Sequence, residues 1–188
     1  HEDFTWNGHQ HTVFATLGKE FADRCIVLTA PSKTFNIAGL QVSNILIPNP
    51  TIRNRFKEQV NAFGYSQLNT LGLVAAEAAL RDGLPWLQEV RAYMDRNIRY
   101  FDDYLKQNLP QLTLIQPEGT YLLWVDFRRL GLTEVQRQDL LVHRANLWLD
   151  SGAIFGPSGD GFERFNIACP RATLTQALQQ LTQALAEN

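Results

Sequence analysis

The chain has 188 residues, of which 45% are hydrophobic and 19% are charged, a composition typical of globular rather than disordered proteins. Its 17 basic and 19 acidic side chains give a formal net charge of -2, so nothing in the charge favours nucleic acid or an anionic membrane as partner. No apolar run is long enough to span a bilayer, and the first residues, HEDFTWNGHQH, do not resemble a signal peptide. We therefore expect a cytoplasmic protein.

The cysteines and histidines do not predict a metal site. Cys25 and Cys169 lie in strand-like runs without metal-ligand spacing, which predicts buried free thiols in a reducing compartment. His9 and His11 are two residues apart, but no third ligand accompanies them, so we expect solvated histidines. The chain starts at His1 without a cap, strand or linker, and we expect it to be one segment of a longer polypeptide.

Two apolar runs and two helical patterns occupy the first part of the chain. The run CIVLT (25–29) predicts a fully buried strand, and LQVSNILIPNP (40–50) predicts a second strand that is ended by prolines. Apolar residues then recur every three or four positions over 51–63, which predicts an amphipathic helix with Thr51 as its N-cap. The segment 68–83 is apolar nearly all round, which predicts a buried helix.

A long helical pattern at 85–109, with Pro85 in its first turn, predicts a connecting helix that contains a domain boundary. It separates residues 1–84 from residues 110–188. In the latter, the patterns predict two strands around a Pro-Glu-Gly turn and a helix with Thr133 as N-cap. The run LWLDSGAIFG then predicts an extended segment, RFNIACP a strand, and the last residues a closing helix. These elements describe a compact α+β unit.

Lys33 is one of only four lysines and follows the first predicted strand, in the sequence APSKTFNIAGL. A lysine buried at the end of a strand is expected to have a lowered pKa, because desolvation disfavours the ammonium form. The neutral amine that results is a nucleophile suited to Schiff-base chemistry. The alternative is a lysine that extends from a loop into solvent.

The stretch SKTFNIAGLQVS (32–43) resembles the cofactor-lysine motif of the fold-type I pyridoxal-phosphate (PLP) enzymes, the class I/II aminotransferase superfamily. Within the superfamily it is most similar to the MalY/PatB group of cystathionine β-lyase-like C–S lyases. Two further blocks are similar to this group, EGTYLLWVDFR (118–128) and GDGFERFNIACPRATLTQAL (159–178). The three blocks follow the order of the family and together cover essentially the whole chain.

The resemblance implies an α/β fold of the PLP-transferase type. Residues 1–84 would be the later part of the PLP-binding large domain, which has a mostly parallel sheet. Residues 85–109 would be the connecting helix, and residues 110–188 a small α+β C-terminal domain. The resemblance also implies a homodimer.

The resemblance further implies which residues bind the cofactor and the substrate. Lys33 would hold PLP as a Schiff base, Ser32 would contact its phosphate, and His1 would lie beside the ring hydroxyl. His1 matches the end of the family's Asp-Glu-Ile-His sequence, whose aspartate would precede residue 1. The Pro-Arg of the third block implies Arg171 as the arginine that binds the substrate carboxylate through a bidentate contact. Arg164 is the competing candidate and is expected to be structural.

Two positions depart from the family pattern. Many aminotransferases have a serine three residues before the lysine and an arginine eight residues after it, and both contact the cofactor phosphate. Here these positions are Ala30 and Gln41. Phosphate binding would then rest on Ser32, on Thr29 and on groups upstream of this chain, which argues against a standard aspartate-type aminotransferase.

The resemblance therefore implies PLP-dependent β-elimination on cystathionine or cysteine-like amino acids, which gives pyruvate, ammonia and a thiol. An aminotransferase that exchanges amino groups between an amino acid and a keto acid is the alternative, since both reactions use every residue named above. A second alternative is a non-catalytic isolated fragment in which Lys33 is idle.

Overall fold

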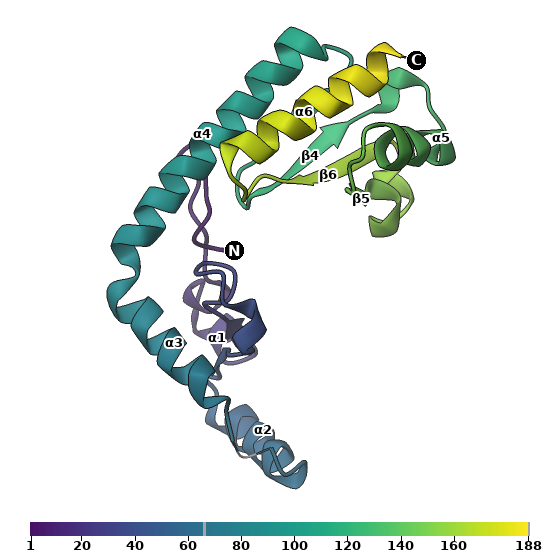
Figure 1. Cartoon of the computed structure of the whole chain (residues 1–188). Helices are drawn as coiled ribbons and strands as arrows, with labels where there is room; N and C mark the ends of the chain where they lie inside the picture. The colour runs from purple at the N-terminus through teal and green to yellow at the C-terminus, as the bar shows by residue number, and fades with distance from the viewer. Residues whose placement is uncertain (66, 188) are drawn as a thin grey trace. The chain divides into compact units, whose positions relative to one another are not determined.

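The computed structural model describes residues 1–65 and 67–187, which divide into two compact units (Figure 1). The first unit comprises His1–Asp3 and Gln10–Glu89, and the second comprises Phe4–His9 and Val90–Asn188. The division along the main part of the chain falls inside the 25-residue helix α4 (Leu84–Asn108).

The first unit contains a small sheet with helices on either side of it in sequence. Strands β1 and β2 pair antiparallel, so the parallel pairing that the resemblance implies for the large-domain sheet is not represented among the described residues. The elements of this unit before α4 are η1 (Phe14–Thr16), α1 (Lys19–Ala22), β1 (Val27–Thr29), η2 (Ala38–Leu40), β2 (Asn44–Leu46), α2 (Pro50–Ala62) and α3 (Thr70–Asp82).

Two predictions of burial in the first unit are wrong. The middle of β1 is open, since Leu28 is 69% exposed, and in α3 only Gly72 is buried. Leu71 and Val74 of α3 are 70% and 61% exposed. An apolar run becomes buried only where the chain supplies a surface to cover it, and among the described residues β1 has a single strand neighbour.

The prediction of Thr51 as N-cap of α2 is also wrong, by two residues. The cap is Asn49, whose Oδ1 accepts hydrogen bonds from the backbone N–H groups of Thr51 and Ile52 at 2.8 and 3.3 Å. Pro50 then occupies the first helical position, where its missing N–H costs nothing. An asparagine followed by proline therefore sets the start of the helix more strongly than a threonine two residues later.

The second unit is built on a four-stranded antiparallel sheet with strand order β3-β4-β6-β5. The predicted strands around the Pro-Glu-Gly turn are present, and Thr133 forms the predicted N-cap, in a capping box with Gln136. The closing helix is present, and its predicted last residue, Asn188, lies outside the described residues. The elements after α4 are β3 (Thr113–Ile115), β4 (Leu122–Asp126), η3 (Arg128–Leu130), α5 (Glu134–Gln138), the π-helix η4 (Asp139–Arg144), β5 (Asp150–Ser151), η5 (Gly152–Phe155), η6 (Pro157–Gly159), β6 (Phe162–Asn166) and α6 (Arg171–Ala186).

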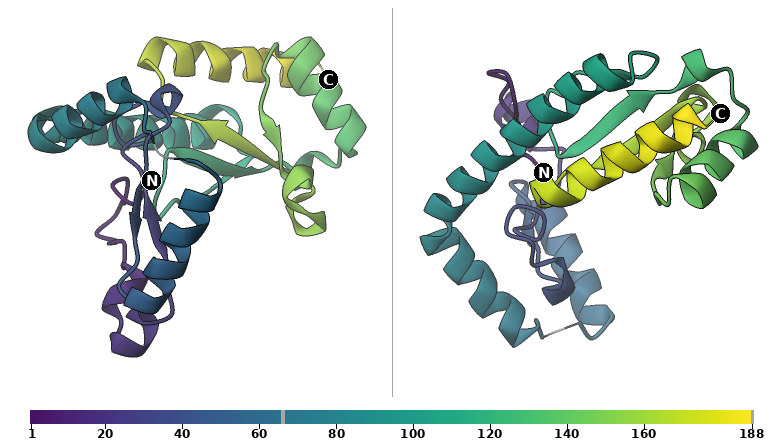
Figure 2. Two further views of the ribbon diagram at one scale, coloured as in Figure 1. Left: turned by 90° about the horizontal axis from the view of Figure 1, so that it is seen from below. Right: turned by 45° about the horizontal axis from the view of Figure 1, so that its top comes forward.

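The core of the second unit lies between one face of this sheet and the helices α4 and α6, which lie side by side (Figures 1 and 2). Side chains of a strand alternate between its two faces, so Leu123 and Val125 of β4 both point inward and are fully buried. Phe165 of β6 meets Phe101 of α4 edge to face, with ring centroids 5.2 Å apart. Burial of each such side chain stabilises the fold by about 1.5–3 kcal/mol.

The cysteines differ from the prediction, as do the two runs expected to be extended. Cys25 and Cys169 are free thiols, but each is half-buried and lies outside the strands. Partial burial raises the pKa of the Cys169 thiol. Of LWLDSGAIFG only Asp150–Ser151 forms a strand, and the chain then turns into η5, whereas the strand expected from RFNIACP begins earlier, at Phe162.

Candidate active site

Lys33 lies in the turn that connects β1 to β2 in the first unit. Within residues 31–36, the backbone N–H of Phe35 donates to the Pro31 carbonyl at 2.9 Å, as in one turn of a helix. Asn36 ends the turn in the left-handed region, with φ of 56°, a conformation that asparagine adopts more readily than most residues. Backbone geometry therefore fixes the Cα of Lys33, while its side chain is exposed.

The predicted burial of Lys33 is wrong for the residues described. The lysine lies in a turn between two short strands, and its side chain is exposed rather than covered by the sheet. The desolvation on which the sequence argument relied is absent here, and the amine is open to a ligand.

A buried hydrogen bond anchors the residue that follows the lysine. The side chain of Thr34 is 3% exposed, and its Oγ1 donates to Asp3 Oδ2 at 2.6 Å. Asp3 belongs to the first unit through the short segment His1–Asp3. This contact therefore joins the start of the chain to the lysine turn.

An aromatic contact anchors the next residue. The ring of Phe35 stacks on Trp86 with centroids 5.9 Å apart and planes 29° apart. At Gly83, an added Cβ would lie 2.4 Å from Cε1 of Phe35 and 2.4 Å from the carbonyl oxygen of Ala79. Only glycine permits this close approach of the helix junction to the lysine turn.

Lys33, Ser32 and His1 thus belong to one unit, whereas Arg171 belongs to the other. Ser32 is half-buried beside the lysine, and His1 is exposed. Thr29, the other phosphate candidate, accepts a hydrogen bond from Asn44 across the strand pair at 3.4 Å. Lys33, Ser32 and His1 carry a primary amine, a hydroxyl and an imidazole, respectively.

Arg171 is the first residue of α6, and its contacts are to neutral groups of α4. Its Nε donates to Asn97 Oδ1 at 2.9 Å and its Nη2 to the Arg96 carbonyl at 2.7 Å. The guanidinium carbon lies 4.2 Å from the centroid of the Tyr100 ring, and the backbone N–H donates to the hydroxyl of Tyr93 at 2.6 Å. These contacts attach the start of α6 to α4.

Arg164 lies on the opposite face of the sheet from the core. Its Nε donates to Asp150 Oδ2 at 3.1 Å, and its Nη2 contacts the same oxygen. The two side chains are 30% and 46% exposed, and they stand directly opposite each other in the register of β5 and β6. Arg164 therefore already holds a carboxylate at a position that solvent reaches.

Aromatic side chains surround this arginine on the same face, and the sequence analysis did not single them out. Trp124 is opposite Arg164 in the register of β4 and β6 and stacks on Phe162, with centroids 5.5 Å apart. Phe155 lies edge-on to Trp124 and under the Arg164 guanidinium, 4.8 Å from it. The alternation of side chains along β4 and β6 could have indicated this cluster, because it places residues 122, 124, 126, 162, 164 and 166 on one face of the sheet.

The opposite face of β6 carries a buried ion pair. Arg137 and Glu163 are 1% and 0% exposed, and Nε of the arginine donates to Oε1 of the glutamate at 2.8 Å. Arg137 also contacts Glu134 and, at 3.2 Å, Asp160, while Glu163 Oε2 has no partner among the described residues. Desolvation raises the pKa of the Glu163 carboxyl. The network links α5 to the sheet of the second unit, whereas Lys33 belongs to the first unit.

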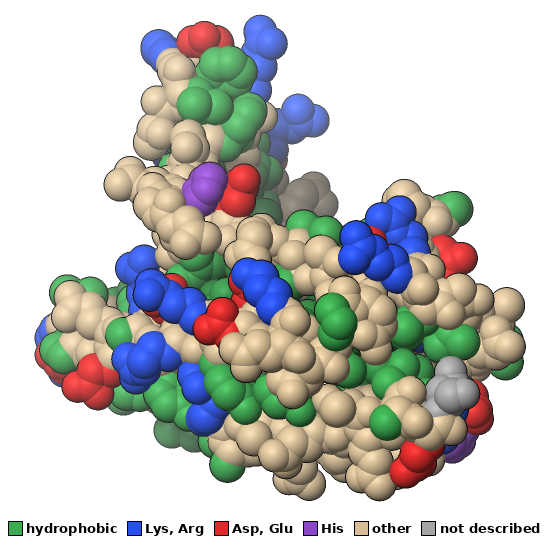
Figure 3. All heavy atoms as spheres, turned by 90° about the horizontal axis from the view of Figure 1, so that it is seen from above, with side chains coloured by type: hydrophobic (Ala, Val, Ile, Leu, Met, Phe, Trp, Pro, Cys, Tyr) green, Lys and Arg blue, Asp and Glu red, His purple; other side chains and the backbone are tan. Residues whose placement is uncertain are grey.

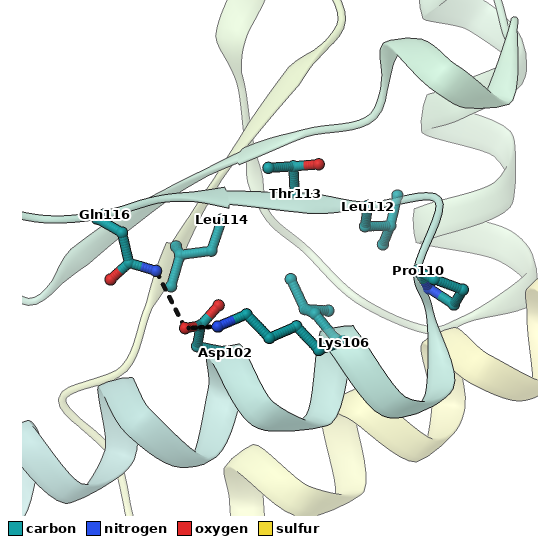
Figure 4. Close-up of a pocket in the computed structure, with 8 residues that line it drawn as sticks. Asp102, Lys106, Pro110, Leu112, Thr113, Leu114 and Gln116 are labelled. Atoms are coloured by element: carbon teal, nitrogen blue, oxygen red, sulfur yellow. Dashed lines mark hydrogen bonds and ion pairs between the residues drawn. The ribbon is translucent and has the colours of Figure 1, made fainter.

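A surface pocket of about 260 Å³ lies elsewhere in the second unit, between the end of α4 and β3. Asp102 accepts hydrogen bonds there from Lys106 at 2.7 Å and from Gln116 at 3.0 Å (Figure 4). The lining of this pocket includes none of the predicted site residues.

Within residues 1–65 and 67–187 no cluster of three or more potential metal ligands occurs, and no helix there could cross a membrane. Lys and Arg side chains lie among Asp and Glu on the face drawn in Figure 3.

The sequence of the chain is similar to those of known bacterial proteins. The chain is 39% identical over 185 residues to cystathionine β-lyase PatB of Bacillus subtilis (strain 168), with 98% of this chain and 48% of that protein covered. It is 30% identical over 187 residues to protein MalY of Escherichia coli (strain K12), with 98% and 47% covered. The chain thus spans about half the length of these relatives. No protein-family model matches it.

Solved structures show the same relationship. Cystalysin from Treponema denticola, whose crystal structure contains PLP, matches with a TM-score of 0.94 and 40% identity, over 100% of this chain and 48% of that one. An aromatic aminotransferase from Pyrococcus horikoshii OT3 matches with a TM-score of 0.85 and 26% identity, over 99% and 49%. PatB and cystalysin are thus more similar in sequence to the chain than this aminotransferase is.

Proposed function

Because the chain belongs to the fold-type I PLP-dependent enzymes and corresponds to their C-terminal half, we propose that the protein is a PLP-dependent C–S lyase. It would act on cystathionine or cysteine-like amino acids and release pyruvate, ammonia and a thiol. The observation that carries the proposal is Lys33, an exposed amine on an anchored turn, in a chain whose similarity to cystathionine β-lyases covers nearly its whole length.

The residues of the first unit fit PLP by their chemistry. An aldehyde requires a primary amine, a phosphate requires hydroxyl or amide donors, and a ring hydroxyl requires a hydrogen-bonding neighbour. Lys33, Ser32 and His1 supply an amine, a hydroxyl and an imidazole. We propose these three residues as the part of the PLP site that this chain contains.

When bound, PLP would supply an aldehyde that joins to amines and a ring that takes up negative charge from the α-carbon of the substrate. Lys33 Nζ would hold the cofactor in the absence of substrate. The Lys33 amine would be the group that takes the α-proton of the substrate as a general base. The position of Lys33 on a backbone-fixed turn supports this role.

Two arginines compete for the substrate carboxylate. The resemblance supports Arg171, since it occupies the Pro-Arg of the third block. The contacts support Arg164, because its guanidinium already holds the carboxylate of Asp150 at a solvent-accessible position, whereas Arg171 is bonded to neutral groups of α4. Because of these contacts we favour Arg164 as the arginine that binds the substrate carboxylate, although the resemblance favours Arg171.

The reaction breaks the bond between the β-carbon and sulfur of the substrate. The α-proton leaves first, the sulfur departs with the bonding electron pair and takes up a proton as a thiol, and water completes the release of pyruvate and ammonia. A substrate without a leaving group on the β-carbon would instead exchange its amino group, which is the aminotransferase alternative.

A direct test separates these two reactions. The full-length, PLP-loaded protein is incubated with cystathionine while pyruvate and thiol are measured. Their formation without any added keto acid supports the lyase, and a strict requirement for a keto-acid acceptor rejects it in favour of the aminotransferase.

A second test addresses the non-catalytic alternative. PLP bound to a lysine absorbs visible light, and borohydride fixes it covalently on that residue. We expect Lys33→Ala to lose this band and Lys57→Ala, which removes an exposed lysine of α2, to keep it. A wild-type protein without the band, or a Lys33→Ala protein that keeps it, rejects Lys33 as the cofactor lysine.

The remaining parts of the proposal concern organisation. We propose that residues 1–84 form the later part of the large domain, residues 85–109 the connecting helix and residues 110–188 the small domain. A homodimer in the cytoplasm is part of the same proposal. Sedimentation of the full-length protein and fractionation of cells test these two points.

A further inference from the structure

The hydrogen bond between Thr34 and Asp3 lies next to two residues of the proposed cofactor site. Thr34 directly follows Lys33, and consecutive Cα atoms are about 3.8 Å apart. Asp3 is two residues from His1, which places their Cα atoms within about 7 Å. The bond thus joins the backbone that carries the proposed base to the backbone that carries the proposed ring neighbour.

The properties of this bond suit it to positioning. Thr34 is 3% exposed, so its hydroxyl is removed from water and has little freedom to exchange partners. The acceptor is a carboxylate, and charge-assisted hydrogen bonds are stronger and shorter than neutral ones, in agreement with the 2.6 Å between Oγ1 and Oδ2. A threonine also has few rotamers, which limits the movement of the turn.

The other anchors of the turn leave a specific task for this bond. The contact of Phe35 with Trp86 holds the turn to the start of α4, and the backbone bond from Phe35 to Pro31 holds its internal shape. Neither of them reaches the segment His1–Asp3. Among the described contacts of the turn, the bond from Thr34 is the one that fixes it relative to that segment.

We propose that Asp3 and Thr34 are positioning residues that hold the Lys33 amine and the His1 imidazole at a fixed separation across the cofactor. This inference rests on the proposed function, because it assumes that Lys33 and His1 both face PLP. It assigns a role to two residues that would touch neither the cofactor nor the substrate.

The experiment uses the full-length, PLP-loaded protein with Thr34→Val, Thr34→Ser, Asp3→Ala and the double variant Asp3→Ala/Thr34→Val. Valine keeps the volume of threonine and removes the donor, while serine restores the hydroxyl. We measure the pH midpoint of the visible PLP band, the rate at which the apoprotein recovers this band with added PLP, and kcat and KM with cystathionine.

We expect Thr34→Val and Asp3→Ala each to shift the midpoint of the band and to lower kcat by roughly tenfold or more, because small displacements of a catalytic group have large effects on rate. Thr34→Ser should stay near wild type. The double variant should be no worse than either single variant, since each removes the same bond.

The matched control is Thr182→Val, which removes a threonine hydroxyl that contacts Tyr104 at 3.1 Å in the second unit. It should lose stability without any shift of the band. If Thr34→Val does not fold, the same measurements on Asp3→Ala test the positioning role. Variants that fold and keep the wild-type midpoint, recovery rate and kcat overturn the positioning role, whereas a wild-type protein without a band overturns the proposed function instead.

Discussion

Asn97 holds Arg171 in place from inside the second unit. The amide is fully buried in α4, and its Oδ1 accepts from Arg171 Nε at 2.9 Å. Its Nδ2 donates to the carbonyl groups of Ile167 and Cys169, each at 3.0 Å. One side chain therefore satisfies the backbone where β6 ends and also orients the first side chain of α6.

The first prediction concerns this amide. Asn97→Ala removes this partner from the carbonyl groups of Ile167 and Cys169 and from Nε of Arg171, so we expect it to lower the free energy of unfolding by about 3 kcal/mol. Urea unfolding of the full-length protein measures the loss. Asn108→Ala is the control, because it removes an exposed amide at the end of the same helix and should change the stability by less than about 0.5 kcal/mol. Equal losses of unfolding free energy in the two variants would contradict the stabilising role of the Asn97 amide.

The second prediction separates the two arginines. If Arg164 binds the substrate carboxylate, Arg164→Gln should raise KM for cystathionine by about tenfold or more and leave the visible band of bound PLP intact. Arg171→Gln should mainly lower the stability, because its contacts are internal. Steady-state kinetics and urea unfolding of both variants test this. The opposite pattern, with KM raised only in Arg171→Gln, returns the role to Arg171.

The third prediction concerns the junction beneath the lysine turn. In Gly83→Ala the new Cβ would lie 2.4 Å from Phe35 Cε1, so the ring that stacks on Trp86 must shift away from residue 83. We expect a loss of about 1–3 kcal/mol in the free energy of unfolding, typical of overpacking. We also expect slower recovery of the PLP band by the apoprotein. Gly131→Ala serves as a comparison, since no atom lies within 4 Å of its new Cβ and only its positive φ opposes the change.

Local chemistry in the sequence predicted the elements of the second unit well. The hairpin of β3 and β4, the Thr133 cap and the closing helix depend on alternation, capping and apolar spacing within a few residues. The Asn97 and Arg164 contacts depend instead on residues 14 to 74 positions apart, which no local pattern specifies.

Burial in the first unit could not be predicted in the same way. The apolar composition of α3 and β1 predicts that something covers them, but it does not say which residues do so. The sequence placed Lys33 between two predicted strands, and the structure has it in the turn between β1 and β2. The anchor itself, Thr34 to Asp3, spans 31 positions and required the structure.

The last prediction follows from the buried glutamate of β6. Desolvation raises the pKa of Glu163, so between its ordinary value of 4.5 and its value in the fold the folded state binds more protons than the unfolded chain. The free energy of unfolding must therefore fall as the pH rises through that interval. Glu163→Gln keeps an oxygen that accepts from Arg137 Nε but removes the ionisation.

We therefore expect the difference in stability between wild type and Glu163→Gln to shift in favour of the variant as the pH rises above about 4.5. Urea unfolding of the full-length protein over a series of pH values measures this difference. Glu89→Gln, which changes an exposed glutamate, should give a difference that hardly varies with pH over the same range. A parallel course for wild type and Glu163→Gln would mean that the carboxyl of Glu163 is not desolvated in solution, and that water reaches its Oε2 atom.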